Sequence, residues 1–192
     1  MIFVSVNPFA LKRFFIFLLA AIGFSCLSCF GESVLVGVKT TPYDRQMSRI
    51  RPILVSSGSR AERDVSFGMV NYWIGNLRSI PYGFTKEWKT PSETVSGAGA
   101  DCKAKAVALY KKMQDHGAIN VRLVIGKRAR NSRSTHAWIE WETPTGSYVL
   151  DPTLNWRAYQ GRDVGLRSYI PLYAFEGDRK FRVASTTLLA RN

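Results

Sequence analysis

Cysteine, histidine and acidic side chains are all scarce in this sequence. Its 192 residues include three cysteines, two histidines and 14 acidic residues against 27 basic ones, which gives a net charge of +13. Internal repeats and low-complexity blocks are absent, so repeat architectures are excluded. No base-stacking module or groove-reading motif accompanies the basic residues, so nucleic acid is not an expected partner. The charge instead favours anionic surroundings, such as a membrane surface or an acidic protein.

The basic residues are scattered along the chain rather than gathered in one dense stripe. Their tightest group is Lys127, Arg128, Arg130 and Arg133, which lies between two predicted strands. We interpret this group as a solvated basic loop, and a nucleic-acid contact is the alternative that its composition leaves open.

Acidic residues are missing altogether from the first 31 positions. Lys12 and Arg13 precede an apolar run that ends among small residues near Cys29. This order of basic, apolar and small residues is typical of an export signal, so residues 1–31 are predicted to direct the chain to the periplasm or out of the cell. A lipoprotein signal at Cys29 and a retained membrane anchor are the two alternatives. Residues 32–192 are predicted to form one domain, since their length suits a single core.

Removal of residues 1–31 would also remove Cys26 and Cys29. Cys102 would then be the single cysteine of the mature chain, which excludes an intramolecular disulfide. A lone cysteine in an exported protein either pairs with another chain or serves as a reactive thiol. The sequence around Cys102 therefore has to distinguish these roles.

Hydrophobic periodicity predicts helices in the first half of the domain and strands in the second. Helices are expected at residues 65–79, after Thr90 as an N-cap in a capping box with Glu93, and at residues 103–116. Strands are expected at residues 34–38, 121–125, 135–142, 148–150, 169–175 and 180–183. The polar, turn-rich residues 41–64 are predicted to form a wrapping arm. Helices followed by antiparallel strands indicate an α+β domain.

Cys102 stands at the start of the predicted helix, after the glycine-rich run Gly97–Asp101. Free N–H groups and the helix dipole at such a position stabilise a thiolate. The same N–H groups can bind the oxyanion of a tetrahedral intermediate. An inert cysteine on a buried helix face is the alternative, and the glycine-rich approach favours a nucleophile.

A nucleophilic thiol needs a general base, and the chain has two histidines to offer. His116 ends the helix that Cys102 begins, and at ~1.5 Å of rise per residue it lies about 20 Å away. His116 is therefore expected to be a residue of the helix C-terminus. His136 is left as the candidate base.

The hairpin around residues 143–146 supplies a candidate partner for His136. If these four residues form the loop, Glu142 faces Ser147, and Asp151 then lies on the same sheet face as His136. With strands ~4.8 Å apart, the two Cα atoms would be about 8 Å apart, which suits a hydrogen bond between the side chains. The alternative role of Asp151 is to open the turn at the following proline.

Four short motifs appear in order along the chain: Pro91-Ser92-Glu93, Gly99-Ala100-Asp101-Cys102, Thr135-His136-Ala137-Trp138 and Leu150-Asp151-Pro152-Thr153. Together they resemble the bacterial transglutaminase-like cysteine peptidases, over a stretch from about Val70 to Thr153. The resemblance implies a papain-like α+β core with the nucleophile at the N-terminus of a central helix that packs on an antiparallel sheet. It also implies that Cys102 is the nucleophile, His136 the base and Asp151 the residue that orients the base.

One departure from that family concerns calcium. Its calcium-dependent members carry acidic residues just after the nucleophile, where this sequence has Lys103 and Ala104. A divalent cation beside Lys103 would lack ligand charge, so neither a metal nor another cofactor is expected.

Three functions fit the resemblance. The first is hydrolysis of peptide or isopeptide bonds in a protein or peptide substrate, through an acyl-enzyme on Cys102. The second is acyl transfer to an amine, as in true transglutaminases, and the third is a non-catalytic binding domain of the same fold. Trp88 and Trp138 are expected in the core, with an indole N–H aimed at an oxyanion as the alternative.

Overall fold

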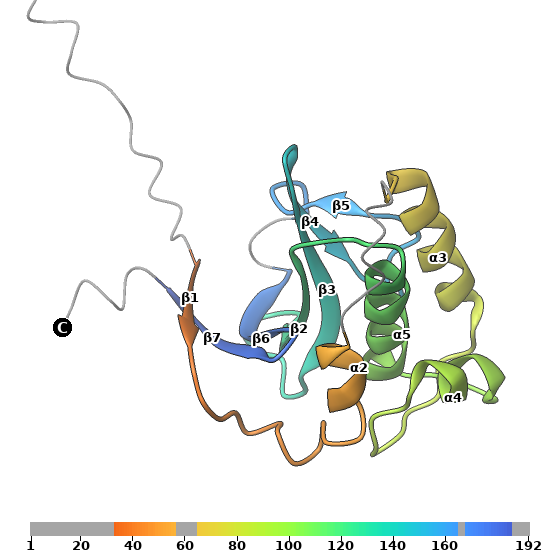
Figure 1. Ribbon diagram of the computed structural model, residues 1–192, viewed down its shortest axis with the longest axis horizontal. Helices are drawn as coiled ribbons and strands as arrows, with labels where there is room; N and C mark the ends of the chain where they lie inside the picture. Colours follow the sequence, from red (N-terminus) through yellow and green to blue (C-terminus); the bar gives the residue numbers. More distant parts are fainter. Residues whose placement is uncertain (1–32, 57–64, 165–167, 186–192) are drawn as a thin grey trace, which may run out of the picture. The chain divides into compact units, whose positions relative to one another are not determined.

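The antiparallel sheet forms most of the second half of the chain (Figure 1). The computed structural model describes residues 33–56, 65–164 and 168–185. In these ranges the strands form one sheet in the order β1-β7-β6-β2-β3-β4-β5, and all its pairs are antiparallel. The strands are β1 (Ser33–Gly37), β2 (Val121–Lys127), β3 (His136–Thr143), β4 (Gly146–Leu150), β5 (Tyr159–Gln160), β6 (Ile170–Glu176) and β7 (Arg179–Ser185).

Helix α5 lies against the sheet and contacts the other helices (Figure 1). The helices are α2 (Arg51–Val55), α3 (Phe67–Ser79), α4 (Pro91–Ser96) and α5 (Cys102–Asp115). Helix α5 packs on β2 and β3, and it also contacts α2, α3 and α4. The expected α+β architecture, with a central helix on an antiparallel sheet, is therefore confirmed.

Alternating side chains of β3 give the sheet two buried faces. Ala137, Ile139 and Trp141 belong to the large core that includes the buried face of α5. Trp138 belongs to a smaller cluster with Val149, Val124, Ala174 and Tyr169. His136 is the first residue of β3 and lies two positions before Trp138, so both side chains are on the same face of the sheet. At the end of the strand, the His136 side chain can extend beyond the sheet.

Both ends of α5 have capping residues. Asp101 is the N-cap, and its Oδ1 atom accepts a hydrogen bond from the Ala104 N–H at 3.0 Å. Gly117 follows the helix with φ = 83°, a conformation that glycine adopts without strain. The predicted capping box of α4 is present as well, since Thr90 and Glu93 exchange side-chain and backbone hydrogen bonds.

The register expected for the β3–β4 hairpin is confirmed, because Glu142 pairs with Ser147. The expected four-residue loop is wrong, since Thr143 pairs with Gly146 and only Pro144 and Thr145 remain between the strands. Two short elements were not expected. Helix α2 lies inside the predicted arm of residues 41–64, where Pro52 occupies an early helical position that tolerates proline. Strand β5 pairs with β4 through only two residues, too few for a periodic signal.

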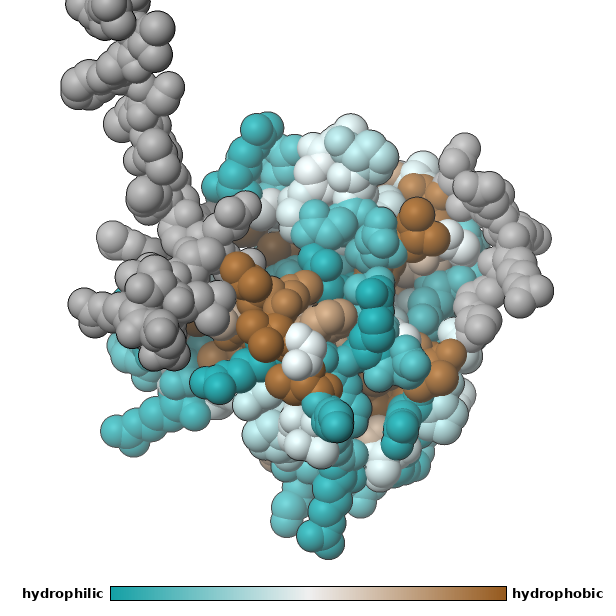
Figure 2. All heavy atoms as spheres, turned by 60° about the vertical axis from the view of Figure 1, so that its left-hand side comes forward, coloured by the Kyte–Doolittle hydropathy of each residue, from teal (hydrophilic) through white to brown (hydrophobic). Residues whose placement is uncertain are grey.

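The side of the molecule that comes forward in Figure 2 carries hydrophilic and hydrophobic groups next to one another, without one dense hydrophilic stripe. In the part of the chain that the structure describes, no helix is long and apolar enough to cross a membrane. The predicted export signal of residues 1–31, with Cys26 and Cys29, lies outside the described residues.

Candidate active site

The candidate nucleophile is the first residue of α5. Cys102 is a free, half-buried cysteine. The preceding residues are held by the segment after α3, because the Ala100 N–H donates to the Pro81 carbonyl at 2.9 Å and the Gly83 N–H donates to the Ala100 carbonyl at 3.4 Å. These bonds fix the backbone that leads into the helix and leave the thiol at its exposed end.

His136 and Asp151 come together from neighbouring strands. His136 begins β3, and Asp151 directly follows β4. The Nε2 atom of His136 lies 2.8 Å from the Oδ2 atom of Asp151, whose side chain is completely buried. The geometry expected from the hairpin register is thus the geometry observed.

The sequence suggested two roles for Asp151, as the partner of His136 and as the residue that opens the turn, and each carboxylate oxygen serves one of them. Oδ2 contacts His136 and accepts a hydrogen bond from the Tyr169 hydroxyl at 2.9 Å. Oδ1 accepts hydrogen bonds from the backbone N–H groups of Thr153 at 2.9 Å and Leu154 at 3.2 Å. One carboxylate therefore orients the imidazole and also holds the turn at the following proline.

Burial and charge act in opposite directions on His136. Burial alone would lower its pKa, but hydrogen bonds to Asp151 and Cys102, together with the charges of both partners, raise the pKa to about 9. For Asp151, burial would raise the pKa, and the hydrogen bond and charge of His136 lower it below the usual value. The structure thus favours an imidazolium–carboxylate pair next to the thiol at neutral pH.

Aromatic side chains cover the pair on the sheet side. The rings of His136 and Trp138 stack with centroids 6.2 Å apart, and Tyr169 packs edge-on against Trp138 at 5.1 Å. The guanidinium of Arg128 lies 3.8 Å above the Tyr169 ring. The prediction of a solvated loop is therefore wrong for Arg128, which is half-buried against this cluster.

Three functional neighbours were not found from the sequence. Tyr169 was assigned to a strand, and no spacing signal links it to Asp151, which lies 18 positions earlier. Lys105, which the sequence did not single out, is buried and donates to the carbonyl of Ile80 at 2.6 Å. Burial lowers the pKa of Lys105. Arg78, at the end of α3, donates to the carbonyl of Thr153 beside the Asp151 turn.

The other sequence candidates have structural surroundings. His116 contacts the Lys112 carbonyl through Nδ1 at 2.7 Å and packs against Trp73, as expected for a helix C-terminus. Trp88 and Trp138 are both buried, which confirms their expected place in the core. The indole N–H of Trp138 is directed to Glu140 at 3.4 Å.

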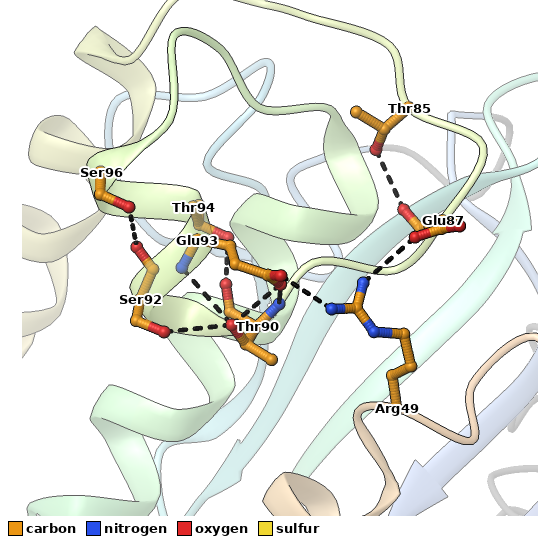
Figure 3. Close-up of polar contacts among 8 residues, drawn as sticks. All are labelled: Arg49, Thr85, Glu87, Thr90, Ser92, Glu93, Thr94 and Ser96. Atoms are coloured by element: carbon orange, nitrogen blue, oxygen red, sulfur yellow. Dashed lines mark hydrogen bonds and ion pairs between the residues drawn. The ribbon is translucent and has the colours of Figure 1, made fainter.

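A surface pocket of about 610 Å³ lies beside the loop that precedes Cys102. Its walls come from Arg49 and from residues between Thr85 and Gly97. Arg49 points between Glu87 and Glu93 and pairs with both, at 3.2 and 2.7 Å (Figure 3). These pairs join Arg49 to both carboxylates of the lining, which also contains Lys86 and Lys89 but not Cys102.

Among the described residues, no group of three or more His, Cys, Asp or Glu side chains is arranged to hold a metal ion. His136 interacts with the thiol from the sheet side, and the residues on either side of Cys102 in sequence, Asp101 and Lys103, form an ion pair. The arrangement can supply a thiol, an imidazole held by a buried carboxylate, and the free N–H groups of a helix start.

Comparison with known proteins gives a similarity of fold. No family model matches the sequence, and no curated protein matches it. Solved structures of Legionella pneumophila LapG do match: the EGTA-treated form has a TM-score of 0.54 at 15% identity, over 67% of this chain and 77% of that one. The calcium-bound form has a TM-score of 0.53 at 16% identity, over 67% and 82% of the two chains. This chain therefore has the mixed α and antiparallel β fold of LapG, which is transglutaminase-like.

Proposed function

We propose that this chain is an exported cysteine peptidase that cleaves peptide or isopeptide bonds through Cys102, His136 and Asp151. The observation that carries the proposal is the His136 imidazole, which contacts the buried Asp151 carboxylate at 2.8 Å and interacts with the Cys102 thiol. The fold shared with LapG agrees with the family that the four sequence motifs resemble. Fold alone does not carry function, so the proposal rests on the site.

The geometry suggests how the three side chains divide the work. Because Nε2 of His136 is engaged by Asp151, Nδ1 is the ring nitrogen left for the thiol. The thiolate of Cys102 attacks the substrate carbonyl, and the free N–H groups at the start of α5 stabilise the oxyanion. The imidazolium then gives its proton to the leaving amine, and a thioester on Cys102 remains.

Water completes the reaction. His136, now neutral, accepts a proton from the attacking water, and the thioester breaks to release the carboxylic acid and the thiolate. The sum of the steps is one amide and one water converted into an acid and an amine. Replacement of the water by an amine would give the transglutaminase product from the same acyl-enzyme.

The proposed place of action follows from the predicted export signal and from the excess of basic residues. The predicted signal in residues 1–31 sends the chain across the inner membrane, either to the periplasm or out of the cell. The net charge of +13 favours contact with anionic lipid surfaces there. A surface protein or peptide of the envelope is therefore the proposed substrate.

Envelope extracts of cells that make the wild-type chain or Cys102→Ala provide the test. Fragments that need Cys102 should also disappear with His136→Ala, because nucleophile and base act as a unit. Asp151→Asn should retain weak residual cleavage, since asparagine keeps the shape of the aspartate beside His136 but disturbs the imidazole tautomer. Cleavage that persists with His136→Ala would remove His136 from the proposed triad.

A further inference from the structure

Lys103, the residue directly after the candidate nucleophile, places its charge on the helix side of the site. Its Nζ atom donates to the Asp101 Oδ2 atom and to the Thr85 carbonyl, the latter at 2.9 Å. The ammonium also lies 5.1 Å from the centroid of the Phe84 ring. The Lys103 side chain is 19% exposed and the Asp101 side chain 1% exposed, so this ion pair is largely removed from water.

The Asp101 carboxylate has structural contacts besides its pair with Lys103. Asp101 caps α5 through Oδ1, and its Oδ2 atom accepts a hydrogen bond from the Thr85 N–H at 3.3 Å. A buried carboxylate needs a cation nearby, because an uncompensated charge in the interior is costly. Lys103 supplies that cation, and it joins the segment at Thr85 to the first turn of α5.

The same oxygens would suit a divalent ion if Lys103 were absent. A carboxylate oxygen and a backbone carbonyl are ligands that calcium prefers. Here the two oxygens are occupied by an ammonium, and the next residue is Ala104. The described residues around the thiol therefore do not fit a divalent cation.

We propose that Lys103 is a built-in cation that neutralises the buried Asp101 carboxylate, occupies oxygens that a divalent ion would need, and fixes the segment Tyr82–Thr85 beside Cys102. The Gly83 N–H also donates to the Ala100 carbonyl at 3.4 Å, so the segment lies against the backbone that leads into Cys102. Lys103 is a positioning residue, and its importance for catalysis rests on the proposed function.

Hydrogen exchange of the full-length chain measures the tether without any substrate. In Lys103→Met, the amides of residues 82–90 should exchange about tenfold faster than in the wild type, because the charge-assisted bonds that hold the segment are lost. Lys111→Met is the matched control, since Lys111 lies on the same helix and pairs with Asp115 on the surface. Its exchange at residues 82–90 should equal that of the wild type.

Equal exchange in Lys103→Met and the wild type would overturn the proposal. If the methionine variant does not fold by circular dichroism, Lys103→Gln takes its place, because it keeps a polar N–H donor and removes the charge. The same tenfold difference is then expected. Loss of protection in both Lys103→Met and Lys111→Met would also overturn it, since the effect would then belong to the whole helix.

Calcium tests the other half of the proposal. The wild-type melting temperature and its exchange at residues 82–90 should be the same in EGTA and in millimolar calcium, since the ammonium already occupies the oxygens. Stabilisation of the wild type by calcium would show that a metal ion binds, and the proposal that Lys103 serves as the cation of this site would then be wrong. Neither measurement needs the thiol, so both can be repeated in Cys102→Ala, where failure of the proposed peptidase activity cannot affect them.

Discussion

On the sheet side of the site, His136 is held by the completely buried carboxylate of Asp151. This carboxylate meets four donors, two of them backbone N–H groups. On the helix side, Cys102 is half-buried, and the segments around it are tied by lysine side chains that donate to backbone carbonyls. Lys103 reaches Thr85, Lys105 reaches Ile80, and Lys89 reaches Gly99 at 2.8 Å. The base is therefore fixed by a buried carboxylate, whereas the segments around the nucleophile are tied by lysine side chains, of which Lys105 is buried and Lys103 is 19% exposed.

This difference has a physical consequence. Buried hydrogen bonds to a carboxylate are shielded from water and salt, so the sheet side should change little with ionic strength. The tethers of Lys89 and Lys103 are partly solvated and belong to flexible side chains, whereas Lys105 is buried. The helix side is then the part of the site that can adjust to a substrate, and the sheet side is the fixed reference.

The largest difference in stability is expected between two aspartates. Asp151→Ala should lower the free energy of unfolding by about 3 to 5 kcal/mol, because it leaves buried donors and an imidazolium without a partner. Asp101→Ala should cost about 2 to 3 kcal/mol, because the helix loses its N-cap and Lys103 loses its partner, although the 19% exposed Lys103 side chain can turn to water. Urea denaturation measures both. Equal losses would mean that the two sides are held with the same strength.

The pH dependence of stability should come from the sheet side. The pKa of His136 is raised to about 9 in the folded protein, so its contribution is complete below the unfolded value near 6.5 and is lost as the pH rises through 9. Between those values the unfolding free energy should fall by up to roughly 3 kcal/mol. Denaturation curves of His136→Ala should lack this slope. A slope that persists in the variant would come from other groups.

A smaller effect is expected from Tyr169, whose hydroxyl donates to the same Asp151 oxygen that contacts His136. Tyr169→Phe should reduce turnover about tenfold through a lower kcat, because a single hydrogen bond to a charged group is lost. The pH profile should shift as well, since the carboxylate loses a donor. Tyr148→Phe is the control, because that hydroxyl bonds to Thr145 and Gln160 at the far end of the hairpin. Equal profiles for the wild type and Tyr169→Phe would limit Tyr169 to packing.

The parts that could be predicted from the sequence are those with local signals. The capping box at Thr90, the start of α5 at Cys102 and the Glu142–Ser147 register each depend on residues a few positions apart. The register in turn brings His136 and Asp151 onto one face. Hydrophobic periodicity and turn residues therefore predict the helices and strands, and within the site they predict the His136–Asp151 pair.

The parts that the sequence did not reveal depend on distant contacts. Arg78 and Thr153 are 75 positions apart, and Lys103 and Thr85 are 18 apart across an irregular segment. Helical periodicity places Lys105 on α5 but does not show that the end of α3 covers it. Tertiary packing decides such contacts, and a single sequence carries no spacing rule for them.

The central claim is that the Cys102 thiol and the His136 imidazole act as one unit. Alkylation of full-length protein with iodoacetamide, followed at the Cys102 peptide by mass spectrometry, tests it without a substrate. The wild type should react much faster than free cysteine at pH 6, and His136→Ala should lose that advantage, because the imidazolium stabilises the thiolate. A wild-type rate that rises only near pH 8.5, as for an ordinary thiol, or a rate that His136→Ala leaves unchanged, would contradict the account.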